Sequence, residues 1–489
     1  MDFVKDRGEK HMESQVIYKL RYRASENKKM TQVCYFGLEE NDANKSGTDI
    51  TSSSLQKTEY VNKSLVPLVL LMTMPNFVIV LWYTVIHCNG SYLQMLSVFT
   101  EKSVFSGMSY IWSLARSPSP VIIWSLVLYG VYALAMMKLL PGQTVFGPVT
   151  PKGNVPVYKD NGFIFFVLTM ILFWTLTLLL HPFEISPSVY YDKFDEMIVA
   201  LNVCSILFCF ALYLKGKLAP SSTDSGSSGN IIFDYYWGME LYPRIFGFDV
   251  KVFTNCRFGL MIWALMVCIH AVKSYELHGF VDSMFVSALL QIVYLAKFYW
   301  WEAGYLSTID IIVDRAGFYL CWGCMVYVPV LYTLVTFYLV THPEHLGLPV
   351  SAVLILAGLL SLYINYEADL QKQKVRKTNG ECLIWGQKPD IIRAKYQLET
   401  GETKESILLA SGWWGISRHF HYVPEIMLAF LWSLPAMFEN LLPYTYVIFL
   451  VVLLIHRSFR DDGKCCQKYG TFWSQYCEKV HYRIVPHLF

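Results

Sequence analysis

Apolar runs long enough to cross a lipid bilayer recur along most of the chain and constrain its fold more than any other feature. A transmembrane helix needs about 20 mostly apolar residues, and in lipid only helices or closed barrels satisfy every backbone hydrogen bond. The last block, Ile426–Ile455, is too long for one span, and Pro435, Glu439, Asn440 and Pro443 interrupt it, which predicts two short helices and a tight turn. Together the runs predict an all-α, polytopic integral membrane protein with about ten transmembrane helices. The other runs are Leu65–Ile86, Val121–Leu140, Phe163–Leu180, Met197–Leu214, Phe258–Val272, Met284–Trp300, Phe318–Val340 and Val350–Ile364.

The composition agrees with a membrane protein and argues against several other classes. Of the 489 residues, 54% are hydrophobic and only 16% are charged, whereas a soluble protein carries roughly a quarter charged residues. The formal net charge of +2 gives no support for nucleic-acid binding. The 12 Cys residues are scattered, several of them inside apolar runs. That distribution is typical of reduced, buried thiols and predicts neither a disulfide scaffold nor a metal site.

Lysine and arginine residues predict how the chain crosses the membrane. The basic segments are the N-terminal tail, Lys372–Lys404 and Arg457–Arg483. An even number of spans places all three on one side, which is cytosolic by the positive-inside rule. Residues 1–61 are polar, so we expect a disordered cytosolic tail without a cleaved signal peptide. Asn89-Gly90-Ser91 would then lie on the lumenal side as a glycosylation acceptor.

Several ionisable side chains fall at membrane depth or at its edge, where a charge is costly and usually faces a cavity or a partner. We interpret Lys297 as a snorkelling or paired lysine. Glu302, which follows Trp300 and Trp301, is equally compatible with a structural ion pair and with a functional acid. The other such residues are His270, Glu276, Asp310 and Asp314.

A polar, aromatic stretch, Leu408–Tyr422, lies between the last two apolar blocks. It combines two adjacent Trp, two Gly, an Arg and two His, whereas an ordinary loop favours Ser, Asn, Asp and Pro. Aromatic faces, a backbone that can be approached closely at Gly, and a cation are what a flat anionic ligand needs. The stretch therefore predicts a binding site for such a ligand.

Basic side chains recur on the expected cytosolic side. Lys372 and Arg376 stand at i and i+4 on one helix face, which the positive-inside rule alone would also explain. Arg418, Lys464 and Lys468 add to them in other segments. Because Arg and Lys recognise phosphate groups well, the set predicts a clamp for a pyrophosphate and a 2′-phosphate. No G-x-G-x-x-G or G-x-x-x-x-G-K-[ST] motif occurs, so the nucleotide is expected between helix ends and the tail rather than in a Rossmann fold or P-loop.

Two long motifs occupy the C-terminal part of the chain. They are S-G-W-W-G-x-x-R-H-x-x-Y, at Ser411–Tyr422, and R-D-x-x-x-C-x-x-K-Y-G-x-x-W-x-x-Y-C, which begins at Arg460. Both resemble the integral-membrane sterol reductase family, and the resemblance extends from about Tyr60 to the end of the chain. It implies a reductase membrane domain over residues 62–489, with a cofactor-binding part at approximately 367–489. The motifs W-G-M-E-L-Y-P-R, V-F-T-N-C-R-F-G and R-H-F-H-Y-V-P-E are most similar to members that reduce the sterol Δ7 double bond.

The resemblance implies that NADPH binds on the cytosolic side through matched positions. Lys372 and Arg376 would hold phosphate, and Leu409 and Trp414 would line the nucleotide. At three positions the chain departs from the family, with Cys324 in place of a usual Asp, His421 in place of a common Asn, and Lys297 where an acidic or apolar residue is usual. The remaining positions expected to contact the cofactor are Arg418, His421, Tyr422, Asp461, Cys465, Cys466, Gln467, Lys468, Tyr469 and Tyr476.

The same resemblance implies reduction of the C7–C8 double bond of a 5,7-diene sterol, such as 7-dehydrocholesterol, in sterol biosynthesis. The enzyme would act in the endoplasmic reticulum membrane, in association with other enzymes of sterol biosynthesis. A proton added at C8 leaves an allylic cation at C7, which then accepts a hydride from NADPH. Protonating carbon requires an acid held in a dry site.

By the same resemblance, Tyr294 and Asp461 form the expected proton-relay pair. Tyr alone, with a pKa near 10, is a poor acid for an alkene, so a partner is physically sensible. Glu302 is the reserve candidate for the acid. Without the resemblance, Tyr294 is compatible with an ordinary packed aromatic residue, and Asp461 with a solvated acid that pairs with Arg457 or Arg460.

Other functions are weighed against this one. A sterol Δ14-reductase of the same family is the first alternative, because fold alone does not separate the two reactions. A membrane methyltransferase of the isoprenylcysteine carboxyl type shares the R-H-x-x-Y…E pattern but binds S-adenosylmethionine and would not need Lys372 and Arg376. A di-iron desaturase would need more closely spaced His residues than the chain has at His342-x-x-His345 and His419-x-His421. A non-catalytic sterol binder would have no use for a phosphate clamp.

Overall fold

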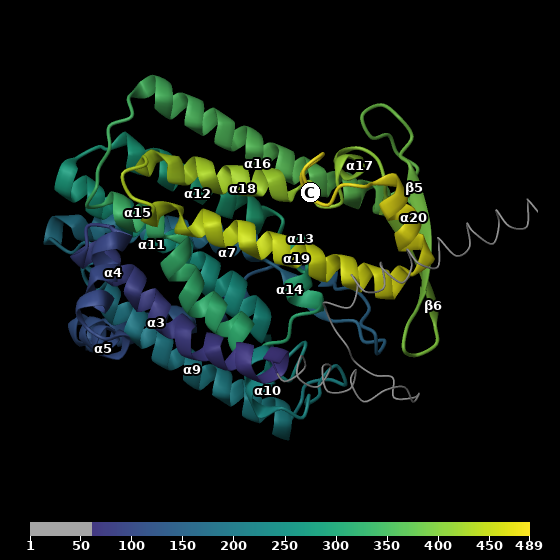
Figure 1. Cartoon of the computed structure of the whole chain (residues 1–489), viewed down its shortest axis with the longest axis horizontal. Coiled ribbons are helices and arrows are strands. Elements are labelled where there is room, and N and C mark those ends of the chain that lie inside the picture. The colour runs from purple at the N-terminus through teal and green to yellow at the C-terminus, as the bar shows by residue number, and fades with distance from the viewer. Residues whose placement is uncertain (1–60) are drawn as a thin grey trace, which may run out of the picture.

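The computed structural model describes residues 61–489 (Figure 1), so the disordered tail predicted for residues 1–61 lies, apart from Val61, outside the described part. Within 61–489, nine helical stretches are long and apolar enough to cross a membrane, and an apolar helix over Tyr422–Ala436 is shorter. The prediction of a polytopic, mostly helical membrane protein is therefore confirmed. The apolar elements are α3 (Val66–His87, after η1, Val61–Leu65), α6 (Pro120–Leu139), α7 (Gly162–Leu180), α9 (Phe194–Leu218), α11 (Leu260–His278, after η3, Val252–Gly259), α12 (Asp282–Trp300), η4 (Phe318–Tyr332) with α15 (Leu334–Leu339), α16 (Leu348–Lys377), α18 (Tyr422–Ser433) and α19 (Thr445–Tyr469).

The last apolar block divides as predicted, at its prolines. Helix α18 runs into the short turn η5 (Leu434–Ala436), and η6 (Leu442–Tyr444) leads into α19. Helix α19 is longer than expected, with 25 residues, because it continues past the apolar run into the basic tail. The positions from Asp461 to Tyr469 therefore lie on a helix that emerges from the membrane.

The helices differ in how deeply they lie in the bundle. In Val252–His278, 83% of the most apolar window of the span is buried, and in Phe318–Leu339 the buried share is 89%. The corresponding shares are only 11% in α6 and 17% in α7. Val252–His278 and Phe318–Leu339 therefore form the centre of the bundle. In contrast, α6 and α7 expose apolar side chains, as a lipid-facing helix does. Helix α16 packs along α12 and α18 beside this centre. The polar residues where these three helices meet form the deeper part of the site described below.

Three antiparallel hairpins are present in the described chain and were not predicted. In the longest, β5 (Ile391–Gln397) pairs with β6 (Thr403–Leu409), with Ile391 opposite Leu409. Its residues alternate, since Ile392 and Ala394 are buried and Arg393 is exposed, as expected for a sheet with one covered face. The buried face packs on Trp473 and Tyr476 of α20 (Thr471–Lys479). The other hairpins are β1 (Gln143–Phe146) with β2 (Val157–Asp160) and β3 (Arg244–Ile245) with β4 (Phe248–Asp249).

The polar segments gather at one end of the bundle. Figure 1 shows the β5–β6 hairpin and α20 at the right-hand end, close to α17 (Trp413–Ile416), with α4 and α5 at the opposite end. Helices α16 and α19 end, and α3 begins, toward the hairpin end. The described parts of the basic segments thus share one end, as an even number of spans predicts. The remaining short helices are α4 (Tyr92–Glu101), α5 (Val104–Leu114), η2 (His181–Phe183), α8 (Val189–Asp192), α10 (Ile231–Trp237), α13 (Glu302–Tyr305) and α14 (Ile309–Ile312).

Candidate functional site

The end of α16 packs against the polar stretch Leu408–Tyr422. Lys372 Nζ lies 4.1 Å from the centre of the Trp414 ring, a cation–π contact. Trp414 Nε1 donates a hydrogen bond to the backbone carbonyl of Ala368 on α16 at 2.7 Å, and the indole is buried. Two of the predicted cofactor positions, Lys372 and Trp414, are thus brought together by the fold.

Gly412 lets the chain turn tightly against α16. Its φ is +62°, which residues with a side chain rarely adopt, and a Cβ there would collide with the Gln371 side chain. Gln371 Oε1 accepts a hydrogen bond from the backbone N–H of Trp413 at 3.0 Å. The Trp413 ring stacks on Phe420 with a centroid distance of 4.7 Å. The paired indoles are therefore largely covered by protein, and they shape the wall of the site more than they offer open faces to a flat ligand.

Two largely buried histidines lie beside Asp461 and Tyr422. His419 Nε2 is 3.9 Å from Asp461 Oδ2, and the His421 and Tyr422 rings are 4.4 Å apart. Burial lowers the pKa of His419 to about 4, and burial together with the charge of Lys372 lowers the pKa of His421 to about 3. Both are therefore neutral at pH 7. Within residues 61–489, His419 Nε2 and His421 Nδ1 are buried without a hydrogen-bond partner, which is uncommon and indicates a partner outside the chain.

Three cations in this part of the chain, Lys372, Arg376 and Lys468, have no carboxylate partner among the described residues. Lys468 Nζ is 4.1 Å from the centre of the Tyr396 ring and 5.1 Å from that of Tyr469. Arg376 Nε donates to a backbone carbonyl of β6 at 3.4 Å. Across 61–489, neither these two residues nor Lys372 forms an ion pair with a carboxylate. Such a group suits phosphate oxygens, which Arg and Lys bind through charge-assisted hydrogen bonds.

Other predicted cofactor positions line the same wall. Leu409 ends β6 and is buried in one cluster with Trp414. The Tyr476 hydroxyl donates to the Trp414 backbone carbonyl at 3.3 Å, and Cys465 Sγ is 3.9 Å from Asp461 Oδ2. The next two positions on α19 are Cys466 and Gln467.

Arg418 is occupied by the C-terminal tail. Its Nη1 donates to the backbone carbonyls of Val480 at 2.8 Å and His481 at 3.0 Å. Its Nε lies 3.4 Å from Asp462 Oδ1, and Asp462 also pairs with Arg483 at 2.5 Å. In this geometry Arg418 anchors the tail over the site, whereas the sequence analysis expected it to bind phosphate.

A second polar group lies deeper, where α12, α16 and α18 meet. The Tyr294 hydroxyl donates to Glu425 Oε1 at 2.6 Å. Asn365 Nδ2 donates to Glu425 Oε2 at 3.0 Å, and Lys297 Nζ donates to Asn365 Oδ1 at 2.8 Å. Lys297 is thus a paired lysine, as interpreted. The hydrogen-bond partner of Tyr294 is Glu425, whereas Asp461, its expected relay partner, lies beside His419.

Glu425 and Asn365 are site residues that the sequence analysis missed. Asn365 directly follows the apolar run Val350–Ile364, and Glu425 directly precedes Ile426–Ile455. Polar side chains at the edge of such a run usually face a cavity or a partner. Glu425 also ends the motif R-H-F-H-Y-V-P-E. The signal was therefore present, but nothing in the sequence shows that the two residues meet.

Glu302 belongs to a structural ion pair. Both of its carboxylate oxygens accept hydrogen bonds from the Arg257 guanidinium, which also donates to Asn161 Oδ1 at 2.8 Å. Arg257 and Glu302 are 0% and 2% exposed, so each compensates the buried charge of the other. Glu302 was interpreted either as part of a structural ion pair or as a functional acid, and the structure supports the ion pair. Glu302 is not a neighbour of the Tyr294 hydroxyl.

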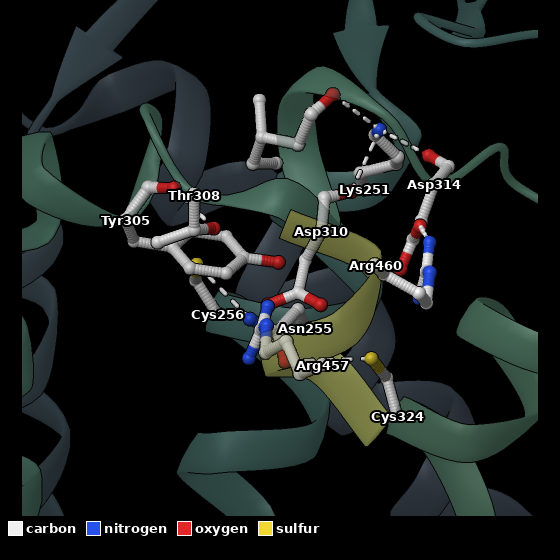
Figure 2. A network of polar contacts seen from close by, with 11 residues as sticks. Lys251, Asn255, Cys256, Tyr305, Thr308, Asp310, Asp314, Cys324, Arg457 and Arg460 are labelled. Carbon is white, nitrogen blue, oxygen red and sulfur yellow. Dashed lines mark hydrogen bonds and ion pairs between the residues drawn. The ribbon is translucent and has the colours of Figure 1, made fainter. Parts of the chain in front are cut away.

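The loop around α14 holds α19 in place, as Figure 2 shows. Arg457 pairs with Asp310, and Arg460 pairs with Asp314. Lys251 fixes the same loop by donating to the backbone carbonyls of Asp310 at 2.9 Å and Asp314 at 2.7 Å. Arg457 and Arg460 thus both form ion pairs with acids of the loop. The alternative in which one of them pairs with Asp461 is not what the structure shows.

Comparisons with known proteins agree with the resemblance of the motifs. The sequence model described as "Ergosterol biosynthesis ERG4/ERG24 family" matches residues 57–489. The chain is 51% identical over 427 residues to a 7-dehydrocholesterol reductase of Arabidopsis thaliana, covering 86% of this chain and 96% of that protein. It is 36% identical over 387 residues to a 7-dehydrocholesterol reductase of Danio rerio, covering 78% and 80%. It is also 34% identical over 432 residues to a Delta(14)-sterol reductase of Methylotuvimicrobium alcaliphilum, covering 86% and 94%. On this evidence the chain belongs to the ERG4/ERG24 family of sterol reductases.

Proposed function

We propose that the protein reduces the C7–C8 double bond of a 5,7-diene sterol, with NADPH as the reductant. The observation that carries the proposal is that Asn365 connects the deeper polar group around Glu425 with the polar stretch that contains His421. Its Nδ2 donates both to Glu425 Oε2 and to the backbone carbonyl of His421, each at 3.0 Å. Lys372 follows on the same helix two turns later, about 10 Å along the axis. A proton donor and an anionic reductant would thus meet along one side of α16.

The residues of the wall fit NADPH. Lys372, Arg376 and Lys468 offer positive charge without ion-pair partners in 61–489, which suits the phosphate groups. The ring nitrogens of His419 and His421 that lack partners among the described residues offer neutral hydrogen-bonding groups for the rest of the nucleotide. When bound, NADPH would supply the hydride. In this proposal residues 62–489 are the reductase membrane domain, and approximately 367–489 its cofactor-binding part.

The task of the protein itself is to deliver a proton to carbon away from water. Tyr294 lies against Trp263 and Trp432, with ring centroids 5.8 and 5.6 Å away. Both tryptophans are 1% exposed, whereas Tyr294 keeps part of its surface free. Protonation of C8 by this hydroxyl would leave the charge at C7, conjugated with the C5–C6 alkene. Fixed neighbours instead of mobile water then determine how well the charge is accommodated.

The sterol class and the location have separate support. The names of the Arabidopsis and Danio relatives support a 5,7-diene substrate, since 7-dehydrocholesterol is one. The gathering of basic segments at one end of the bundle supports cytosolic termini. Residence in the endoplasmic reticulum membrane and association with other sterol-biosynthesis enzymes complete the proposal.

A direct assay tests the reaction. Purified protein is incubated with NADPH and 7-dehydrocholesterol, and the sterols are then separated and identified. We expect the ultraviolet bands of the conjugated diene to disappear together with one equivalent of NADPH, and the product to lack the C7–C8 double bond. Unchanged bands in the presence of folded, NADPH-binding protein would overturn the proposal.

Reduction of a Δ14 sterol is the second candidate, because a Delta(14)-sterol reductase is 34% identical to the chain. The same assay with a Δ8,14-diene sterol distinguishes the two, and we expect turnover with the 5,7-diene to be faster. A methyltransferase of the isoprenylcysteine type would be stabilised against heat by S-adenosylmethionine instead of NADPH. We expect NADPH alone to raise the melting temperature.

A further inference from the structure

We propose that Glu425 is the acid that replaces the proton which Tyr294 gives to the sterol, and that Lys297, acting through Asn365, stabilises the carboxylate left behind. This inference rests on the proposed function. It assigns the partner of Tyr294 to a residue of α18, where the sequence analysis expected Asp461 of α19.

The geometry that points to Glu425 is a continuous chain of three hydrogen bonds. It runs from the Tyr294 hydroxyl to Glu425 Oε1 (2.6 Å), from Asn365 Nδ2 to Glu425 Oε2 (3.0 Å) and from Lys297 Nζ to Asn365 Oδ1 (2.8 Å). The residues come from α12, α18 and α16, so their meeting is a property of the bundle. Each carboxyl oxygen of Glu425 accepts one of these hydrogen bonds, and one of the two donors is the hydroxyl of Tyr294, the proposed proton donor.

The charges around Glu425 suit a group that changes between a neutral and a charged form. Within 61–489 no Lys or Arg forms an ion pair with it, whereas Asp310 and Asp314 each pair directly with an arginine. Lys297, Asp369 and Arg457 act on it from α12, α16 and α19 without direct contact. Glu425 is only partly exposed, and a carboxylate with little water and no ion-pair partner is costly, so a carboxyl that holds its proton until the reaction begins is favoured there. The nearby cations then limit the cost of the charged form.

The proposed step balances in protons and electrons. The π electrons of C7=C8 form the new C8–H bond with the proton of Tyr294, as the phenolic O–H bond breaks. In this step the hydrogen bond between the two side chains has the reverse direction: the Tyr294 hydroxyl points to C8, and the carboxyl O–H at Glu425 Oε1 donates to the phenol oxygen. That carboxyl O–H bond breaks at the same time, and its proton restores the phenol. C7 is left with a positive charge and accepts the hydride, with both of its electrons, from the NADPH of the proposed function. Water on the polar side of the site returns a proton to Glu425 after product release.

Lys297 and Asn365 act as positioning residues. The Lys297 ammonium donates to the amide oxygen of Asn365 and so strengthens the donor character of its N–H, which holds the second oxygen of Glu425. No proton passes through the amide. Loss of the ammonium should therefore make formation of the carboxylate harder and shift the pH dependence of the rate, while Tyr294 keeps its hydrogen bond.

The central test is Glu425→Gln, which keeps the shape and removes the acid. Single-turnover reduction of a 5,7-diene sterol should slow by about 100-fold or more, the usual range for a general acid, while the KM for NADPH changes less than about threefold. Glu425→Asp should recover part of the rate, and Lys297→Met should shift the pH–rate profile. The control is Glu439→Gln, because Glu439 is exposed in the turn between α18 and α19 and its loss should leave the rate unchanged. Wild-type turnover by a folded Glu425→Gln variant would overturn the proposal.

A measurement on the wild-type protein keeps the proposal testable if the variants do not fold. Two protons move together in the proposed step, so the rate in mixtures of light and heavy water should follow a curved dependence on deuterium content. A linear dependence, which one moving proton gives, would contradict the relay. If the wild-type protein reduces only a Δ14 sterol, the proposed Δ7 function fails. The Glu425 variants then decide the relay on that substrate, so the two failures are distinguishable.

Discussion

Arg376 is the residue of the proposed NADPH site whose loss should separate cofactor binding from chemistry. Its guanidinium donates to a backbone carbonyl of β6. In the sequence, Arg376 lies beyond Lys372 and so farther from Tyr294. Arg376→Ala should raise the KM for NADPH about 10- to 100-fold, as expected for a hydrogen bond to a charged group, and change kcat less than about twofold. Steady-state kinetics at saturating sterol measures both. Lys377→Ala removes the neighbouring exposed cation and should change neither; equal effects of the two substitutions would mean that only overall charge matters.

His421 allows a test of stability against pH. Burial lowers the folded-state pKa to about 3 for His421 and to about 4 for His419, below the unfolded value of about 6.5. As the pH falls below about 6.5, the unfolded chain takes up protons that the folded protein does not, so stability decreases, by roughly 1–3 kcal/mol per histidine near pH 4. Above that pH both states are neutral and the effect is absent.

The measurement is the melting temperature in detergent between pH 7.5 and 4.5. His421→Asn, which introduces the residue common in the family, should flatten the decrease at acidic pH and leave the melting temperature at pH 7.5 nearly unchanged. His345→Asn is the matched control, because His345 is exposed. A decrease of the same steepness in the wild type and in His421→Asn would show that His421 is not kept neutral by the fold.

At the scale of elements, α19 depends on the loop that contains α14. Asp314 is buried, with its side chain 1% exposed, and pairs with Arg460 of α19. Asp314→Asn leaves the arginine without a counter-charge and should destabilise the protein by about 3–5 kcal/mol, the usual loss when one partner of a buried pair is removed. The comparison is Asp192→Asn, whose side chain is 51% exposed in its pair with Lys273 and should cost about 1 kcal/mol or less. Thermal unfolding in detergent measures both, and equal losses would contradict the role of the loop.

The elements that follow from local physics could be predicted from the sequence, and those that depend on tertiary contact could not. Apolar length alone identified the spans, because a backbone in lipid must satisfy its hydrogen bonds within one helix. The β5–β6 hairpin was missed because its short alternating strands lie in a basic segment and gain their buried face only from α20. Likewise, Tyr294 was identified by resemblance, but its partner Glu425 lies 131 residues away, a distance that no helical periodicity connects.

At the scale of the whole molecule, the site combines two environments along one helix. Asn365 lies where α16 is still surrounded by α12 and α18, whereas Arg376 lies near its end, where the hairpin and α20 gather (Figure 1). In the proposed function a charged, water-soluble reductant binds at the second region, and a sterol from the bilayer binds at the first. The reaction is then possible only if the hairpin end faces the compartment that contains the reductant, which makes the orientation of the bundle a functional property.

A protease-protection experiment tests this orientation. A cleavage site is inserted at Gly401, in the exposed tip of the β5–β6 hairpin, or at Lys102, in the exposed connection between α4 and α5 at the opposite end. In sealed microsomes, protease added from outside should cut at Gly401 and spare Lys102, because the positive-inside rule predicts that the hairpin end lies in the cytosol. Detergent should open both sites. The reverse pattern would put the proposed NADPH site in the lumen and exclude cytosolic NADPH as the reductant, while leaving the proposed proton relay untouched.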